Sequence, residues 1–252
     1  MKILVCNNVS KNFGGVAAVC DVDLEVEQGG IVGLVGPNGS GKTTLFNVIT
    51  GIYPVTGGTI TYAGQPIHNR STHRIIEAGI ARTFQNIRLF SRMSVLENVL
   101  VGYHRCLHVG LVPILLRSNL ASEAEVEAVD KSLEWLEFVG LLDEQSMWAG
   151  DLSYGQQRRL EIARALASDP ALLLLDEPSA GMNPKEVDDL IDLFGDLNKE
   201  LGKTLFIIEH NMDVIMTISD IIYCLDAGQR IACGTPSQVQ QDELVRAAYL
   251  GE

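Results

Sequence analysis

The sequence predicts an α/β fold built on a parallel, doubly wound sheet. Three observations predict it: a glycine-rich octet joins an apolar strand at 31–35 to a helix at 42–50, and two further apolar runs, at 171–175 and 204–208, each precede a helical pattern. Such runs are typical of parallel strands buried on both faces, and their alternation with helices gives a doubly wound core. We therefore expect one large α/β domain in the 252 residues, flanked by a smaller antiparallel sheet.

The octet is the stretch around which the predicted fold is arranged. It reads Gly36-Pro37-Asn38-Gly39-Ser40-Gly41-Lys42-Thr43 and fits the phosphate-loop pattern of Gly, four free positions and Gly-Lys-Ser/Thr. Glycines let successive backbone N–H groups point at a polyphosphate, and the helix that follows adds its positive end. Lys42 then places a cation on the β- and γ-phosphates, and the Thr43 hydroxyl can bind Mg²⁺.

The elements on either side of the octet predict the antiparallel sheet. Residues 3–9 read as an edge strand, 17–26 alternate as an amphipathic strand, and 59–62 lie between glycine turns. Further along we expect a helix at 72–78 that Gly79 ends, an extended segment at 80–85 and a helix at 94–103.

Between residues 104 and 120 the periodicity is lost, although the segment is strongly apolar and contains Gly110 and Pro113. Two interpretations stay open: an irregular loop packed on the core, or a docking patch for a hydrophobic partner. After it, Ser122 and Glu125 form a capping box that predicts the start of a helix. The core face of that helix is predicted to be Val126, Val129, Leu133, Leu136 and Val139.

The second half of the chain continues the alternation of strands and helices. Ser153 and Gln156 form another capping box, before a helix at 156–167, and Asn183-Pro184 starts a helix after the strand at 171–175. The remaining elements are predicted as a helix at 212–218 after the strand at 204–208, a hairpin of 221–225 with 230–233, and a closing helix at 243–250.

Polar groups end two of the buried strands. Asp176 and Glu177 directly follow the apolar run Leu172–Leu175, and successive side chains at a strand end point in different directions. Asp176 can therefore face a metal ion while Glu177 faces an attacking water. His210 follows the strand at 204–208 and could hydrogen-bond a γ-phosphate there.

Composition limits the partners and the compartment. The net charge of −13 argues against general affinity for nucleic acid, because neutralising a phosphate backbone needs clustered Lys and Arg. The five cysteines are scattered without a C-x-x-C spacing, which argues against a zinc site and favours free thiols in a reducing cytosol. The residues Lys2-Ile3-Leu4-Val5 near the start do not resemble a signal peptide, so none is expected, and no apolar run of the sequence reaches membrane-spanning length.

Leu152-Ser153-Tyr154-Gly155-Gln156 resembles the signature sequence of the ABC-type ATPases, Leu-Ser-Gly-Gly-Gln, with Tyr154 in place of the first Gly. With the phosphate loop and Asp176-Glu177-Pro178, the resemblance covers essentially the whole chain. It implies a P-loop NTPase (RecA-like) core with a parallel sheet, an antiparallel β subdomain and an ABC α-helical subdomain. The implied single domain divides into a core at 1–92 and 157–235, a helical subdomain at 93–156 and a C-terminal helix at 236–252.

The resemblance also implies roles for further residues. Phe13 would stack on adenine, Gln85 would meet Mg²⁺ and water, His210 would be the switch histidine, and Ser153 and Gly155 would complete the site of a second chain. Glu177 would be the general base, with His210, Lys42 and Gln85 as the other catalytic residues. The metal ligands would be Thr43, Gln85 and Asp176. The residues expected to contact ATP are Phe13, Gly36, Pro37, Asn38, Gly39, Ser40, Gly41, Lys42, Thr43, Thr44, Gln85, Ser153, Gly155, Gln156, Asp176, Glu177 and His210. Asn183 stands where the family usually has Asp, which leaves the detail of the contact between chains open.

Three segments and the tail narrow the resemblance. Residues 82–90, 180–186 and 209–212, with 248–252 and the insert at 104–120, look like the ATP-binding subunit of branched-chain amino acid ABC importers. That family implies an ATPase that couples hydrolysis to solute import, peripheral on the inner face of the cell membrane. Its implied partners are integral-membrane permease subunits, an identical or paralogous ATPase subunit and, indirectly, an extracytoplasmic solute-binding protein; nucleic acid is not expected.

Four other classes of protein with a phosphate loop are alternatives to the importer subunit: ATPases of exporters, soluble ABC ATPases, kinases and GTPases. Lipopolysaccharide-export ATPases share the tail but, by resemblance, lack the insert, and other exporters remain open. A soluble ABC ATPase acting on ribosomes or DNA would show paired cassettes, coiled-coil insertions or basic tracts, which this sequence lacks. A kinase or GTPase with the same loop would lack the signature, which this sequence has. A GTPase would also carry a guanine-recognition Asn-Lys-x-Asp, which this sequence lacks.

Overall fold

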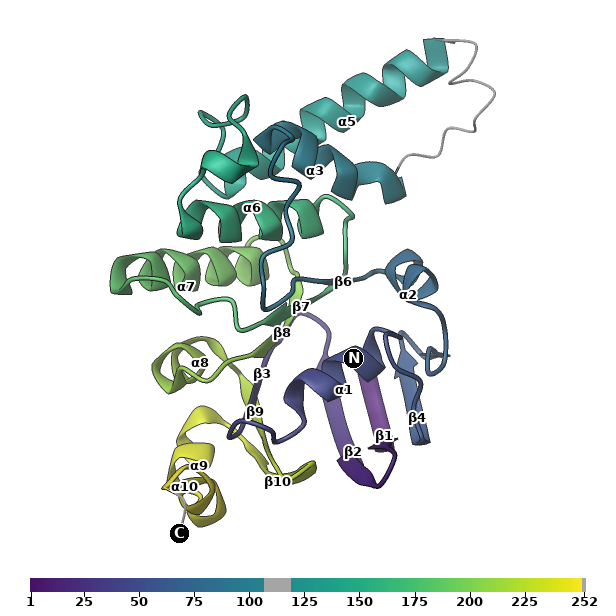
Figure 1. The fold of residues 1–252 in the computed structure, drawn as a ribbon, viewed down its shortest axis with the longest axis vertical. Helices are drawn as coiled ribbons and strands as arrows, with labels where there is room; N and C mark the ends of the chain where they lie inside the picture. Colours follow the sequence, from purple (N-terminus) through teal and green to yellow (C-terminus); the bar gives the residue numbers. More distant parts are fainter. Residues whose placement is uncertain (107–118, 251–252) are drawn as a thin grey trace. The chain divides into compact units, whose positions relative to one another are not determined.

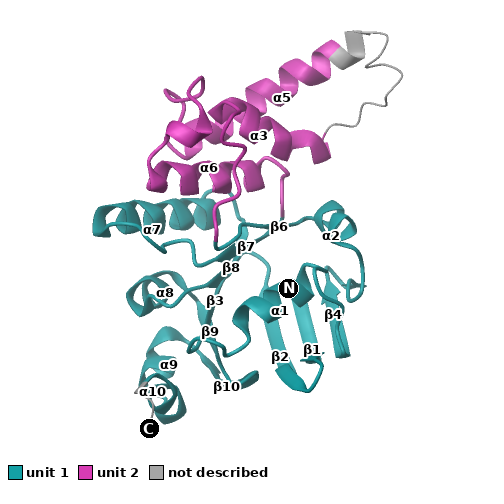
Figure 2. Ribbon diagram, in the orientation of Figure 1, with its two compact units in different colours: residues 1–85, 171–252 teal, residues 86–170 magenta. Residues whose placement is uncertain are grey.

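The computed structural model describes residues 1–106 and 119–250 (Figure 1). The chain divides into two compact units, which Figure 2 shows in different colours: unit 1 is Met1–Gln85 with Ala171–Glu252, and unit 2 is Asn86–Pro170. The boundaries that the sequence suggests for the helical subdomain, at 92/93 and 156/157, differ from the limits of unit 2, Asn86–Pro170, and remain a prediction.

Within the described residues, unit 1 contains the predicted parallel core as a six-stranded sheet. Its strand order is β10-β9-β3-β8-β7-β6, and every pair is parallel except β10 with β9. All residues of β3, β7 and β8 are buried, as their apolar runs predicted. The strands are β10 (Gln229–Gly234), β9 (Ile221–Asp226), β3 (Ile31–Val35), β8 (Thr204–Ile208), β7 (Leu172–Asp176) and β6 (Ile80–Arg82).

The second sheet of unit 1 is antiparallel, with the order β2-β1-β4-β5. Its strands are β2 (Val16–Glu27), β1 (Lys2–Phe13), β4 (Gly57–Tyr62) and β5 (Gln65–Pro66). The expectation that the first strand lies at an edge is wrong, because β1 pairs with β2 on one side and with β4 on the other. Local patterning predicts a strand but does not encode which neighbours it will pair with.

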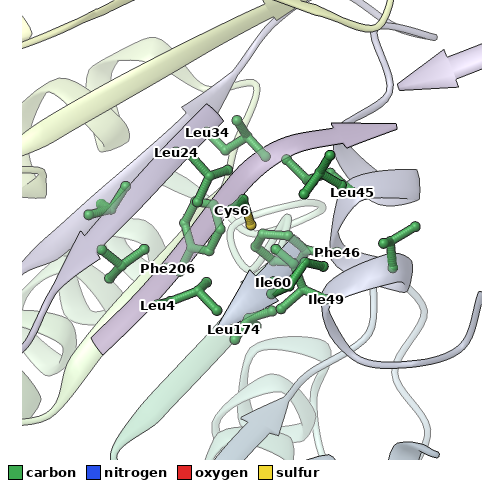
Figure 3. Close-up of a cluster of buried hydrophobic side chains, with 14 of the residues drawn as sticks. Leu4, Cys6, Leu24, Leu34, Leu45, Phe46, Ile49, Ile60, Leu174 and Phe206 are labelled. Atoms are coloured by element: carbon green, nitrogen blue, oxygen red, sulfur yellow. The ribbon is translucent and has the colours of Figure 1, made fainter. Parts of the chain in front are cut away.

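Helix α1 (Lys42–Ile49) packs against both sheets (Figure 3). Its buried face is Leu45, Phe46 and Ile49, and the Phe46 ring lies 4.8 Å from the ring of Phe206 in β8. Side chains of the antiparallel sheet complete the cluster. Those labelled in Figure 3 are Leu4, Cys6, Leu24 and Ile60. Apolar burial against both sheets therefore anchors the helix that carries Lys42.

The other helices of unit 1 cap or connect the strands. They are α2 (Thr72–Ala78), α7 (Pro184–Lys199), α8 (Met212–Ile218), α9 (Pro236–Gln241) and α10 (Glu243–Leu250). Gly79 ends α2 in the left-handed conformation, as predicted. The sequence predicts one C-terminal helix at 236–252. The structure has two helices in this part of the chain, α9 and α10.

The described residues of unit 2 form three packed helices, α3 (Val95–Tyr103), α5 (Asn119–Phe138) and α6 (Tyr154–Leu166), with 3-10 turns at His104–Cys106 and Ala149–Asp151. The predicted capping box at Ser122 is wrong, because α5 already begins at Asn119 and a capping residue needs a non-helical backbone. Val126, predicted to face the core, is 60% exposed. Both interpretations of the segment 104–120 concern residues that lie mostly outside the described part of the chain.

No helix in the two described ranges combines the length and the apolar character that crossing a bilayer requires.

The packing of α1 predicts the effect of shortening Phe46. We expect Phe46→Ala to lower the free energy of unfolding by about 3–5 kcal/mol, because it leaves a cavity between the two sheets. Urea unfolding followed by circular dichroism measures the change. Ile76→Ala, at a residue that is 41% exposed, is the control and should cost less than about 1 kcal/mol. Equal costs at the two positions would contradict the packing described here.

Candidate functional site

Glycine stands at two positions of the loop between β3 and α1 where the backbone passes close to other parts of unit 1. Gly36 and Gly41 have φ angles of +147° and +100°. A Cβ at Gly36 would collide with the Leu225 carbonyl, and one at Gly41 with the Ala18 carbonyl. These two positions exclude side chains for steric reasons, independently of any ligand.

The Lys42 amino group lies within the predicted phosphate loop. Its Nζ donates to the carbonyls of Gly36 at 2.7 Å and Pro37 at 3.0 Å, and lies 3.4 Å from Ser40 Oγ. Burial lowers the pKa of Lys42, and the nearby carboxylates of Glu177 and Asp176 partly oppose that shift. Of the residues expected to contact phosphate here, Asn38, Gly39 and Thr43 are exposed, whereas Gly36, Ser40 and Lys42 are buried.

Three of the predicted catalytic residues meet at one carboxylate. Glu177 Oε2 accepts a hydrogen bond from Gln85 Nε2 at 2.8 Å and lies 3.7 Å from His210 Nδ1. Glu177 itself has a φ of +49°, an uncommon backbone conformation for a residue with a long side chain. Strained backbone of this kind persists only where the surroundings hold it, and it concentrates at functional sites. The arrangement suits a base that receives a proton from a water beside the phosphate loop.

Asp176 is held by a buried arginine that the sequence analysis did not single out. Arg82 Nη2 contacts Asp176 Oδ2 at 2.7 Å, and both side chains are almost fully buried. Its Nη1 donates to Asn47 Oδ1 at 2.7 Å and Thr50 Oγ1 at 3.1 Å. The guanidinium thereby joins the end of β7 to α1 and to the residue that follows it. A basic residue in a strand otherwise made of apolar residues was the available signal.

The residues predicted to hold a metal ion supply oxygen ligands. Thr43 offers an exposed hydroxyl, Asp176 a carboxylate and Gln85 an amide oxygen. Among the residues that the structure describes, His, Cys, Asp and Glu form no group of three or more that could hold a metal. A hydroxyl and one carboxylate, completed by phosphate oxygens, fit Mg²⁺, which prefers hard oxygen ligands and is often bound through substrate phosphates.

Phe13 lies at the end of β1, where it forms an aromatic pair with Tyr53. The two rings are 5.1 Å apart in an edge-to-face arrangement, and Lys11 Nζ lies 4.9 Å from the centre of the Phe13 ring. Phe13 is 42% exposed, which leaves ring surface available for stacking on a base.

A tyrosine of the last helix also reaches the phosphate loop. The Gly36 N–H donates to the Tyr249 hydroxyl oxygen at 2.8 Å. Burial raises the pKa of Tyr249 to about 12, so the hydroxyl stays neutral. The tail at 248–252 carries part of the family resemblance, but nothing local in the sequence indicates that Tyr249 contacts a residue 213 positions away.

In unit 2, the predicted signature residues start helix α6. Ser153 Oγ accepts from the Gln156 N–H at 3.3 Å, and Gln156 Oε1 accepts from the Ser153 N–H at 3.0 Å, which confirms the predicted capping box. Gly155 is buried in the first turn, whereas Ser153 is exposed. A helix N-terminus with an exposed hydroxyl is suited to an anion.

Asn183 keeps the capping function that Asp would have. Its Oδ1 accepts from the Glu186 N–H at 3.1 Å, and Glu186 Oε2 accepts from the Asn183 N–H at 3.0 Å. The replacement of Asp by Asn therefore leaves the start of α7 intact, since both residues are good N-caps.

Two family models match the chain. The model described as ABC transporter matches residues 19–180, and the model described as branched-chain amino acid ATP-binding cassette transporter matches residues 229–252. The chain is 45% identical over 250 residues to the high-affinity branched-chain amino acid transport ATP-binding protein LivG of Escherichia coli K12, covering 99% of this chain and 98% of that one. It is 36% identical over 253 residues to the lipopolysaccharide export system ATP-binding protein LptB of Haemophilus influenzae, covering 100% and 98%.

Solved structures agree with these relatives. The ADP conformation of an ATP-binding cassette of an ABC transporter is 35% identical, with a TM-score of 0.87 and complete coverage of both chains. A dimeric structure of a bacterial ABC transporter cassette is 26% identical, with a TM-score of 0.79, covering 92% of this chain and 98% of that one. The predicted fold class, with its phosphate-loop core, is confirmed.

The buried ion pair gives a testable expectation. We expect Arg82→Met to lower the free energy of unfolding by about 3–5 kcal/mol, because it removes the partner of a buried carboxylate. Chemical denaturation measures this loss. The matched control is Arg74→Met, which removes the exposed Arg74–Glu77 pair and should cost less than about 1 kcal/mol. If Arg82→Met were as stable as the control, Arg82 would not be the structural partner of Asp176.

Proposed function

We propose that this chain drives the import of branched-chain amino acids across a cell membrane. The premise is that the chain belongs to the ABC transporter family, in which it is an ATP-hydrolysing subunit. The observation that carries the ATP hydrolysis in this proposal is the meeting of Gln85 and His210 at the Glu177 carboxylate, in the same unit as a phosphate loop centred on Lys42. The solute assignment is supported by the similarity to LivG and by the match of the tail. It provides a proton acceptor and a phosphate-binding cation.

In this mechanism, the phosphate loop binds the triphosphate through backbone N–H groups, and Lys42 neutralises its β- and γ-oxygens. Phe13 stacks on the adenine. Glu177 accepts the proton of the attacking water, and His210 orients that water and the γ-phosphate. Thr43, Gln85 and Asp176 would hold Mg²⁺, which supplies further charge neutralisation at the phosphate oxygens.

The site is completed by a second chain. Ser153, Gly155 and Gln156, at the start of α6, present a hydroxyl and a helix N-terminus that suit the γ-phosphate bound to a partner. The dimeric cassette among the similar structures supports pairing. The partner is either a second copy or a paralogous ATPase subunit, and the pair acts on permease subunits at the inner face of the membrane. An extracytoplasmic solute-binding protein would deliver the solute.

Import of branched-chain amino acids is favoured over lipopolysaccharide export. Over nearly equal lengths the identity is 45% to LivG and 36% to LptB, and the tail matches the branched-chain amino acid model. An experiment decides between them: the chain is reconstituted with its genomic neighbours in vesicles, and ATP-dependent uptake of radiolabelled leucine is measured. Uptake that needs ATP and the binding protein is expected; ATPase activity without leucine uptake in the complete assembly would overturn the solute assignment.

Replacing the base should separate binding from hydrolysis. We expect Glu177→Gln to bind ATP while its hydrolysis rate falls by roughly 10²- to 10⁴-fold, because the amide cannot accept the proton. The chains should then remain paired around ATP, which size-exclusion chromatography detects. Glu123→Gln, at an exposed residue of α5, is the control and should behave like the unaltered chain. Normal turnover by Glu177→Gln would show that another group is the base.

Removing the loop cation should weaken ATP binding itself. We expect Lys42→Ala to raise the ATP dissociation constant by roughly 10- to 100-fold, since it removes charge-assisted contacts with phosphate. A fluorescence titration with a labelled ATP analogue measures the change, and Lys199→Ala, an exposed lysine of α7, is the control. An unaltered dissociation constant in Lys42→Ala would exclude Lys42 from the phosphate site.

A further inference from the structure

Glu209 is a buried acidic residue to which the proposed mechanism gives no role. It directly follows β8, and its side chain is fully buried. Glu209 Oε1 accepts from the Ser179 N–H at 2.8 Å, and Oε2 accepts from the His210 N–H at 3.2 Å and the Asn211 N–H at 3.3 Å. Both oxygens accept hydrogen bonds, which is the pattern of an ionised carboxylate.

The three bonds join two separate segments of unit 1. Ser179 begins the loop 179–183, which leads from the base Glu177 to the cap of α7 at Asn183. His210 and Asn211 form the connection from β8 to α8, and Asn211 caps α8 by accepting from the Asp213 N–H at 3.1 Å. One carboxylate therefore fixes the backbone of both connections at their starting points.

If Glu209 only capped the start of α8, a buried carboxylate would not be required. A neutral Ser, Thr or Asn satisfies backbone N–H groups at a helix start without burying a charge, and burying a carboxylate is costly unless it is fully hydrogen-bonded. Here the bonds run in two directions, to residue 179 and to residues 210 and 211. A neutral amide has only one carbonyl oxygen and could not serve both directions.

We propose that Glu209 is a positioning residue that couples the loop 179–183 to His210. Displacement of the loop pulls on the same carboxylate that holds the His210 backbone, so the distance from His210 to Glu177 depends on where the loop lies. In the assembled pair this loop is the segment expected to meet the second chain, so pairing sets the position of the histidine. The inference rests on the proposed function, because it concerns the rate of hydrolysis at that site.

The test is a substitution that preserves size and removes one acceptor. In Glu209→Gln, an NH₂ group replaces one oxygen and faces an N–H group, so one of the two connections is lost. We expect kcat for ATP to fall roughly tenfold or more while KM changes by less than about twofold. Glu209→Asp keeps the carboxylate on a shorter stem and should recover part of the lost rate. It also provides the test if Glu209→Gln does not fold.

A double-substitution cycle distinguishes coupling from general support of the fold. If Glu209 acts through His210, Glu209→Gln should change kcat by less than about twofold when His210→Ala is already present. Steady-state hydrolysis of radiolabelled ATP by the full chain, over a range of ATP concentrations, provides kcat and KM, and Glu123→Gln is again the control.

Three results would overturn the inference. The first is an unaltered kcat in Glu209→Gln and Glu209→Asp, and the second is an equal loss of kcat with and without His210. The third is a parallel loss of kcat, ATP affinity and thermal stability, which would indicate a structural role. If the unaltered chain hydrolysed no ATP with its partners present, the proposed function would fail first, which is a separate outcome.

Discussion

The arrangement of the site depends on the burial of helix α1 between two sheets. One face of the helix, formed by Leu45, Phe46 and Ile49, packs into a single cluster of apolar side chains that both sheets supply, with Phe206 against Phe46. A helix anchored in this way holds the loop at its N-terminus in one position. The phosphate loop is therefore preformed by hydrophobic packing, and its charged groups do not have to organise it.

Specific partners hold the buried charged groups of the site. Lys42, Asp176 and Glu209 are all buried, and each is held by specific partners: carbonyls for the lysine, a guanidinium for the aspartate, and backbone N–H groups for the glutamate. The two carboxylates, whose partners are other groups of the protein, keep their direction when a ligand arrives, whereas Lys42 exchanges loop carbonyls for phosphate oxygens in the proposed mechanism. Glu177 and His210 are more accessible, as groups that exchange water and product need to be.

The sequence predicted the parts of this molecule that are encoded locally. The phosphate loop, the buried strands β3 and β8 and the helix α2 depend on residues close together in the chain, and the structure agrees with them. The placement of β1 at an edge and the start of a helix at Ser122 are wrong, because strand neighbours and true helix ends are decided by the rest of the fold. Within the site, Glu177 and His210 are predicted from their positions after buried strands and Gln85 from the resemblance alone, and the three side chains lie together. The local sequence marks Arg82 only as a basic residue among apolar ones, and it gives no indication that Arg82 contacts Asp176, 94 residues away, or that Tyr249 contacts Gly36, 213 residues away.

The positive φ of Glu177 links the chemistry of the chain to its durability. Asparagine and glycine adopt this backbone conformation with less strain than glutamate, so either would relax the turn while removing the side chain that we propose as the proton acceptor. A screen for thermal stability alone would then accept substitutions at position 177 that remove the proposed base. Engineering of this chain would need to measure ATP turnover alongside melting temperature.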